Sequence, residues 1–125
     1  PELAHVGLTE EDAKKHHKGV SVVRWEFDEN DRAQAERDVK GLVKVVTGKG
    51  GKILGASIVG RRAGDLIQIW GSAISNGQTI KVFRNMIAPY PTRGEASKRA
   101  AGAYYTPTLF SKKTKMLVSL LSTSD

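Results

Sequence analysis

The sequence predicts an α+β fold in which an antiparallel sheet carries helices packed on one face. The strand candidates all end by residue 60, whereas the apolar residues from 66 to 74 recur with the period of a helix. A glycine-rich stretch at 48–52 joins two of the strand segments, as the turn of a β-hairpin does. The 125 residues match the size of one domain, so we expect 1–125 to fold as a single domain.

The first expected elements are an extended segment and a short helix. Residues 2–8 are expected to be extended. Thr9 then begins a helix, because its hydroxyl can cap a free backbone N–H and Asp12 adds a negative charge to the first turn. The helix is expected to end in the cationic run at 14–18, since cations followed by Gly19 are typical of a helix C-terminus.

Three further strands complete the predicted sheet. Residues 20–27 alternate apolar and charged side chains, which is the pattern of a half-buried strand. Residues 42–47 and 53–59 are the other two candidates, and 48–52 connects them. Residues 32–38 are expected to form one or two helical turns or a loop.

Helical segments follow the sheet. Residues 63–75 place five apolar side chains on one helical face: Leu66, Ile67, Trp70, Ala73 and Ile74. A short helix is expected at 79–84 and an alanine-rich helix at 92–105. Residues 111–121 are expected to form an amphipathic helix, for which docking on its own domain is simpler than docking on a membrane or a partner.

Composition restricts the possible functions. Twenty basic and 13 acidic residues give a net charge of +7, which is compatible with nucleic acid as a partner, but the basic residues are scattered along the chain. The absence of cysteine excludes disulfides, thiolate metal ligands and a thiol nucleophile within these residues. No apolar run reaches the about 20 residues of a membrane span and no signal-peptide pattern is visible, so we expect a cytoplasmic protein.

Two polar clusters are expected to have structural roles. Residues 48–52 have the residue types of a phosphate loop, but they lie between strands instead of before a helix. His16 and His17 are adjacent, so on a helix their side chains point about 100° apart. His5 is distant in the sequence. We therefore predict no metal site.

The stretch at 88–95 is the most informative. It places Tyr90 between two prolines, which stiffen the backbone and allow a cis bond before Pro91. One interpretation is structural, because Thr92 and Glu95 have the spacing of a capping box at a helix start. The other is functional, with Tyr90 displayed rigidly at a surface and Glu95 nearby to orient it.

Three segments have a familiar order and spacing. Residues 1–10 read PELAHVGLTE, residues 52–67 contain KILGASIVG followed by AGDLI, and residues 91–95 read PTRGE. Together they resemble the C-terminal interface domain of the pyridine nucleotide-disulfide oxidoreductases, which include dihydrolipoamide dehydrogenase, glutathione reductase and mercuric reductase. The resemblance covers about 1–100, and we expect 101–125 to be a C-terminal helical extension.

The resemblance implies a dimerisation domain of FAD/NAD-linked reductases. In this family the domain packs against its two-fold mate in a homodimer and places a His–Glu pair beside the other subunit's flavin and redox disulfide. FAD and NAD(P)H are then expected to be bound by N-terminal domains that these residues do not include. We therefore expect this stretch alone to bind no cofactor and to be catalytically silent.

Tyr90 stands where the family carries histidine. A tyrosine has an unperturbed pKa of about 10, against about 6.5 for histidine, so Tyr90 does not exchange a proton readily near neutral pH, although it can donate a hydrogen bond. By resemblance we assign Tyr90 and Glu95 to the partner subunit's active site, and Tyr90 and Pro91 to the vicinity of its FAD. Mercuric reductases are similar in carrying tyrosine here, but they end in a cysteine pair that is absent from STSD at 122–125.

The leading hypothesis is the dimerisation domain of an FAD-dependent NAD(P)H:disulfide oxidoreductase. A mercuric-reductase-like or non-disulfide flavoprotein is the first alternative, and a basic nucleic-acid-binding module is an alternative of another class. Homodimerisation is also predicted from the apolar side chains. They provide more apolar area than the core of a thin two-layer domain is expected to bury, so part of it is expected to contact a partner. The side chains concerned are Trp70, Ile74, Val82 and Phe83.

Overall fold

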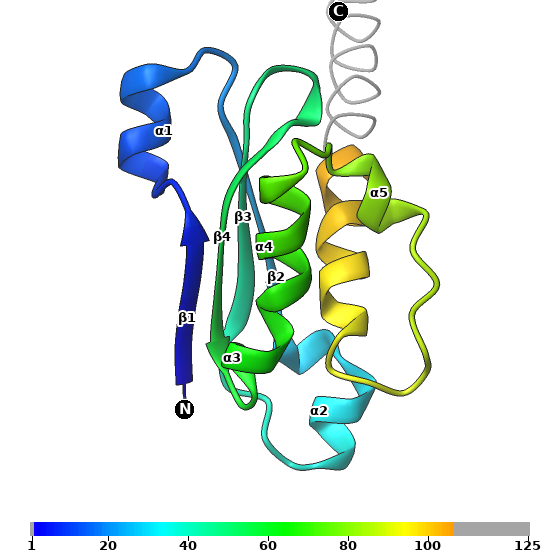
Figure 1. Cartoon of the computed structure of the whole chain (residues 1–125). Helices are drawn as coiled ribbons and strands as arrows, with labels where there is room; N and C mark the ends of the chain where they lie inside the picture. The colour runs from blue at the N-terminus through cyan, green and yellow to red at the C-terminus, as the bar shows by residue number, and fades with distance from the viewer. Residues whose placement is uncertain (1, 107–125) are drawn as a thin grey trace, which may run out of the picture.

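The chain folds around a four-stranded antiparallel sheet with the strand order β1-β4-β3-β2 (Figure 1). The computed structural model describes residues 2–106. The strands are β1 (Glu2–Gly7), β2 (Ser21–Glu26), β3 (Leu42–Thr47) and β4 (Ile53–Gly60). β3 and β4 form the predicted hairpin, whose turn contains the 3₁₀ segment η2 (Lys49–Gly51). The glycine-rich stretch thus joins two strands, as predicted, and does not lead into a helix as a phosphate loop does.

Helices cover one face of this sheet, which confirms the predicted α+β fold class. The predicted helix at 63–75 is divided at Ile67 into α3 (Ala63–Leu66) and α4 (Gln68–Ser75). The short α5 (Lys81–Arg84) follows, and the last described helix spans 95–106 (Figure 1). The remaining short elements are η1 (Phe27–Glu29) and α2 (Asp31–Ala35). The helix expected at 111–121 lies outside the described residues.

The main core lies between the sheet and these helices. Trp70 of α4 and Phe83 of α5 are both buried and stack on each other, with ring centroids 3.8 Å apart. The Trp70 indole N–H donates to Ser97 Oγ at 2.9 Å, which connects α4 to the helix at 95–106. The prediction that Trp70 and Phe83 offer exposed apolar area to a partner is therefore wrong. Packing of α4, α5 and the helix at 95–106 buries both side chains within one chain. Val82 is 40% exposed and Ile74 is partly buried.

Helix α1 (Glu10–His16) is the exception to the one-sided arrangement. It begins as predicted, since Thr9 Oγ1 accepts from the Asp12 backbone N–H at 3.2 Å. Its Ala13 is buried against Val46 and Leu54 in a second, smaller core. Val46 alternates along β3 with residues of the main core, so α1 covers the opposite face of the sheet at one end.

Glu10 attaches α1 to the sheet and makes the domain sensitive to acid. Its carboxylate lies 2.7 Å from Lys14 Nζ and 2.9 Å from Lys44 Nζ of β3. The hydrogen bond from Lys14, followed by that from Lys44, lowers the pKa of Glu10 from 4.5 to about 2. Because the folded state lowers this pKa, the stabilisation is fully present above pH 4.5 and is lost as the pH falls toward about 2.

Replacing Glu10 with glutamine is therefore expected to flatten the loss of stability in acid. Urea unfolding at about pH 7 and about pH 3 measures the loss of unfolding free energy, which should be smaller in Glu10→Gln than in the parent chain. Glu11→Gln is the matched control, since Glu11 is on the same helix with 81% of its side chain exposed. Equal acid sensitivity in Glu10→Gln and the parent would contradict the assignment.

Within 2–106, no helix has both the length and the apolar character needed to cross a membrane.

Candidate functional site

The candidate site is the loop between α5 and the helix at 95–106. As predicted, it is not helical around its prolines, and the Tyr90–Pro91 peptide bond is cis. Tyr90 is 68% exposed, whereas the other aromatic side chains within 2–106 are buried in the core or packed against it. The expectation that Tyr90 is displayed at a surface is therefore confirmed.

Tyr90 is paired with a residue that the sequence analysis missed. Its hydroxyl donates to Asp31 Oδ2 at 2.7 Å, and Asp31 is the first residue of α2. This hydrogen bond, together with the negative charge of Asp31, raises the pKa of Tyr90, and the charge of Glu95 adds a smaller contribution. Tyr90 thus stays a neutral phenol over a wider pH range than a free tyrosine.

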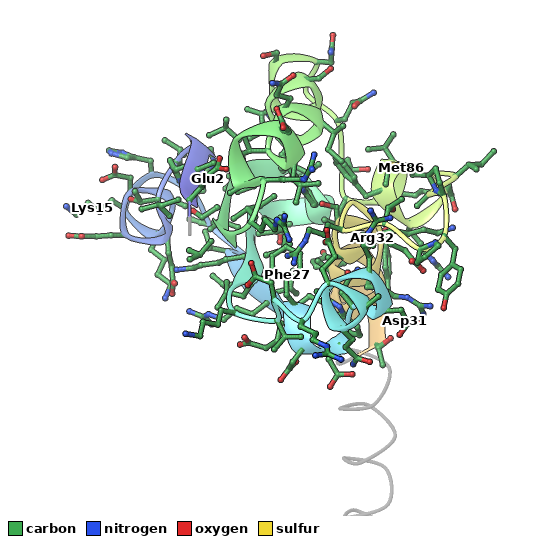
Figure 2. All side chains as sticks on the ribbon, turned by 90° about the horizontal axis from the view of Figure 1, so that it is seen from below. Glu2, Lys15, Phe27, Asp31, Arg32 and Met86 are labelled. Carbon is green, nitrogen blue, oxygen red and sulfur yellow. The ribbon has the colours of Figure 1, made fainter. Side chains whose placement is uncertain are left out.

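The residues next to Tyr90 are also held by the segment 30–38, which contains α2. The Asn30 side-chain amide donates to the Thr92 carbonyl at 3.0 Å, while its oxygen caps α2. Arg32 Nη1 donates to the Pro91 carbonyl at 3.3 Å. In Figure 2, Asp31 and Arg32 lie on α2 at the side next to the yellow loop. The backbone after Tyr90 is therefore anchored by side chains from one short segment.

Arg93 completes this attachment from the loop side. Its side chain is only 3% exposed, and its Nε donates to Glu36 Oε1 at 2.8 Å. Its Nη2 donates to the Asp38 carbonyl at 2.6 Å. The hydrogen bond from Arg93 is the main cause of a lowered pKa for Glu36, so this carboxylate stays charged and the contact persists at neutral pH.

Glu95 is oriented differently from the prediction. Its Oε2 lies 3.7 Å from Arg99 Nη2, one helical turn further on. The Thr92 hydroxyl donates to the Pro89 carbonyl at 2.7 Å, so it is not the acceptor at the helix start. The reciprocal capping box is therefore wrong, because each side chain has a different partner. Within 2–106, Glu95 makes no hydrogen bond to Tyr90 and acts on it only through its charge.

Glu95 lines an open cavity of about 620 Å³ between the helix at 95–106, the loop and β2. Cationic side chains dominate its charge, since Arg84, Lys98 and Arg99 line it together with Glu95. The Trp25 indole N–H is buried beside this cavity and has no partner among the described residues. Tyr90 is not among the residues that line this cavity, whereas Glu95 is.

The histidines do not gather at this site. His5 Nδ1 lies 2.7 Å from Ser57 Oγ and Nε2 lies 2.9 Å from the Gly7 carbonyl, so both ring nitrogens have partners on the sheet. His16 and His17 are exposed at the end of α1. Among the described residues, no group of three His, Asp or Glu side chains is placed to hold a metal ion.

Comparisons with known proteins identify the relatives of this fold. Residues 1–101 match the family described as pyridine nucleotide-disulphide oxidoreductase, dimerisation domain. The chain is 39% identical over 102 residues to dihydrolipoyl dehydrogenase of Geobacillus stearothermophilus and 36% identical over 102 residues to that of Bacillus subtilis. Each match covers 81% of this chain and 22% of the relative, so the chain spans about a fifth of the length of these relatives.

Solved structures agree with the family match. LpdA of Mycobacterium tuberculosis aligns with a TM-score of 0.77 at 24% identity, covering 83% of this chain and 23% of that one. The HOCl-induced flavoprotein disulfide reductase RclA of Escherichia coli aligns with a TM-score of 0.76 at 26% identity, covering 80% and 23%. The first of these supports the fold alone, and the second supports both the fold and the family.

Proposed function

The chain belongs to the pyridine nucleotide-disulfide oxidoreductase family through its dimerisation domain, and from this premise we propose its role. It is the dimerisation domain of an FAD-dependent NAD(P)H:disulfide oxidoreductase that works as a homodimer. Tyr90 and Glu95 contribute to the active site of the partner subunit, and Pro91, which follows Tyr90, lies near its FAD. FAD and NAD(P)H are bound by other domains of the enzyme.

The exposed position of Tyr90 on an anchored loop is the observation that carries this proposal. An aromatic side chain that is 68% exposed does little for its own core. The backbone beside it is nevertheless held by hydrogen bonds from Asn30 and Arg32. A rigid loop that projects an exposed side chain is suited to contact another molecule, and in a homodimer that molecule is the second subunit.

The chemistry available to Tyr90 is hydrogen bonding rather than proton release. Asp31 raises its pKa, so the phenol stays protonated at neutral pH. FAD, when bound in the partner subunit, supplies the electron transfer between NAD(P)H and the disulfide. The hydroxyl of Tyr90 orients the reacting group beside it, and Asp31, which accepts the phenol hydrogen, keeps that hydroxyl in place.

A flavoprotein that reduces an acceptor other than a disulfide is the second candidate. The substitution of tyrosine for the family's histidine favours it, because thiolate–disulfide exchange uses an acid/base that titrates near neutral pH. A mercuric-reductase-like enzyme is one example of this class. The two candidates differ in whether the enzyme turns over small disulfides.

Complementation between two inactive protomers tests the role of Tyr90. We expect Tyr90→Phe to lower turnover of the enzyme on the order of 10²-fold, as loss of one oriented hydrogen-bonding group does. A second variant carries an inactivated flavin site and keeps Tyr90. Random mixing should regain about a quarter of the parent activity, because half of the dimers are mixed and each of these has one complete site.

Two outcomes would contradict this role. Unchanged turnover in Tyr90→Phe would reduce Tyr90 to a surface residue, and absence of recovery on mixing would place it in its own subunit's site. Tyr105→Phe is the matched control, since Tyr105 loses the same hydroxyl but packs beneath the Arg84 guanidinium at 4.4 Å. We expect this control to retain full turnover.

A further inference from the structure

We propose that Asp31 is the positioning residue of Tyr90, and that it holds the phenol hydrogen inward so that the hydroxyl oxygen meets an incoming ligand as a hydrogen-bond acceptor. The pairing itself stands on the geometry of this chain. Its consequence for turnover rests on the proposed function of Tyr90.

The phenol hydroxyl of Tyr90 carries a single hydrogen. A tyrosine hydroxyl has one O–H donor and lone pairs that accept. The hydrogen of Tyr90 is directed to Asp31 Oδ2 across 2.7 Å, the usual length of a strong O–H···O⁻ contact. The remaining lone pairs belong to a side chain that is 68% exposed. The ligand that Tyr90 selects is therefore one that brings an N–H, O–H or S–H donor.

Asp31 and Tyr90 lie on two segments, α2 and the loop, that are also connected by neighbouring hydrogen bonds. Asp31 is flanked by Asn30 and Arg32, which donate to the carbonyls of Thr92 and Pro91. Three consecutive residues of one segment thus contact three consecutive residues of the loop. These contacts hold the backbone that carries Tyr90 beside the segment that carries Asp31, so the phenol donates its hydrogen to Asp31 Oδ2 without any movement of the main chain.

Glu95 is the alternative positioning residue, and its contacts exclude it from this role in the described structure. Its carboxylate pairs with Arg99 and lines the cavity beyond the loop. The charged groups that bear on Tyr90 are thus Asp31 on α2, which accepts its hydrogen, and Glu95 on the helix at 95–106, which acts through space. Both raise the pKa of Tyr90, and the contribution of Asp31 is the larger.

Titration of Tyr90 in the 125-residue chain tests the pairing directly. NMR of ¹³C-labelled tyrosine resolves the three tyrosines, and Tyr90→Phe assigns the signal of Tyr90. In Asp31→Asn the Tyr90 signal should titrate at lower pH than in the parent, because the negative charge is removed while the side-chain shape is kept. In Asp31→Glu, which keeps the carboxylate, its titration should remain closer to that of the parent.

Asp28→Asn is the matched control for this titration. Asp28 is an exposed aspartate of the same region, and its carboxylate has no hydrogen bond or ion pair within 2–106. The same change of charge there should leave the Tyr90 titration where it was. An unshifted Tyr90 in Asp31→Asn, or an equal shift in both variants, would overturn the pairing.

A double-mutant cycle in the enzyme tests the consequence for turnover. Asp31→Ala should lower kcat/KM about tenfold, and adding it to Tyr90→Phe should lower it no further, because the two side chains act as one unit. Additive losses would overturn the positioning role. The two proposals fail separately, since a shifted titration with full turnover in Tyr90→Phe would retain the pairing and reject the proposed function.

Discussion

Replacing Trp70 with alanine is expected to lower the free energy of unfolding by about 3–5 kcal/mol, a large part of what a domain of this size has. Trp70 is fully buried, stacks on Phe83 at 3.8 Å and donates to Ser97. Alanine leaves a cavity between α4, α5 and the helix at 95–106 and removes the partner of the buried Ser97 hydroxyl. The loop that carries Tyr90 lies between two of these helices, so its anchoring should weaken with the core.

Urea unfolding followed by circular dichroism measures this loss. Ile69→Ala is the control, because Ile69 is the neighbouring residue of α4 and is 39% exposed. We expect the control to change the unfolding free energy by less than about 1 kcal/mol. A small effect in Trp70→Ala, equal to that of Ile69→Ala, would show that the stacked pair is not central to the core.

Replacing Gly55 with alanine is the second large effect, with an expected loss of about 3 kcal/mol. A Cβ at this position of β4 would lie 1.9 Å from the Leu8 carbonyl oxygen. This oxygen belongs to the backbone that leaves β1, and the Leu8 N–H donates to the Leu54 carbonyl at 2.9 Å. The backbone segments at Leu8 and at position 55 must therefore move apart, which weakens the junction of β1, β4 and α1. The glycine of the KILGASIVG motif is thus explained by close backbone approach.

Gly102→Ala is the matched control for this substitution. Gly102 lies within the helix at 95–106, and a Cβ there would meet no atom within 4 Å. The same change should stabilise the domain by about 0.5–1 kcal/mol, because alanine loses less backbone freedom than glycine in a helix. If thermal unfolding ranks the two variants in the opposite order, the steric account of Gly55 is wrong.

Local patterns predicted most of the fold. The strand β2 follows the alternation of apolar and charged side chains at 20–27, and the start of α1 follows the capping hydroxyl of Thr9. Each of these features depends on residues within a few positions of one another, so the sequence contains the whole cause.

Burial of Trp70 and Phe83 was not predictable in the same way. Their apolar face is visible in the sequence, but whether it meets solvent, a partner or its own chain depends on where the helix at 95–106 packs. Its small side chains Ala96 and Ala100 are fully buried in the same core. Long-range packing thus decided between an interface and a core.

The sequence by itself determined the α+β class and the family resemblance, because both depend on local period and motif. Only the tertiary structure decided which acid Tyr90 meets. Asp31 is 59 residues away in the chain and sits on a helix too short to give a clear apolar period. Glu95 is near in sequence, but its helix directs it toward Arg99. The partner of the Tyr90 hydroxyl therefore depends on how α2 packs against the loop. A contact of this kind has no characteristic spacing in the sequence.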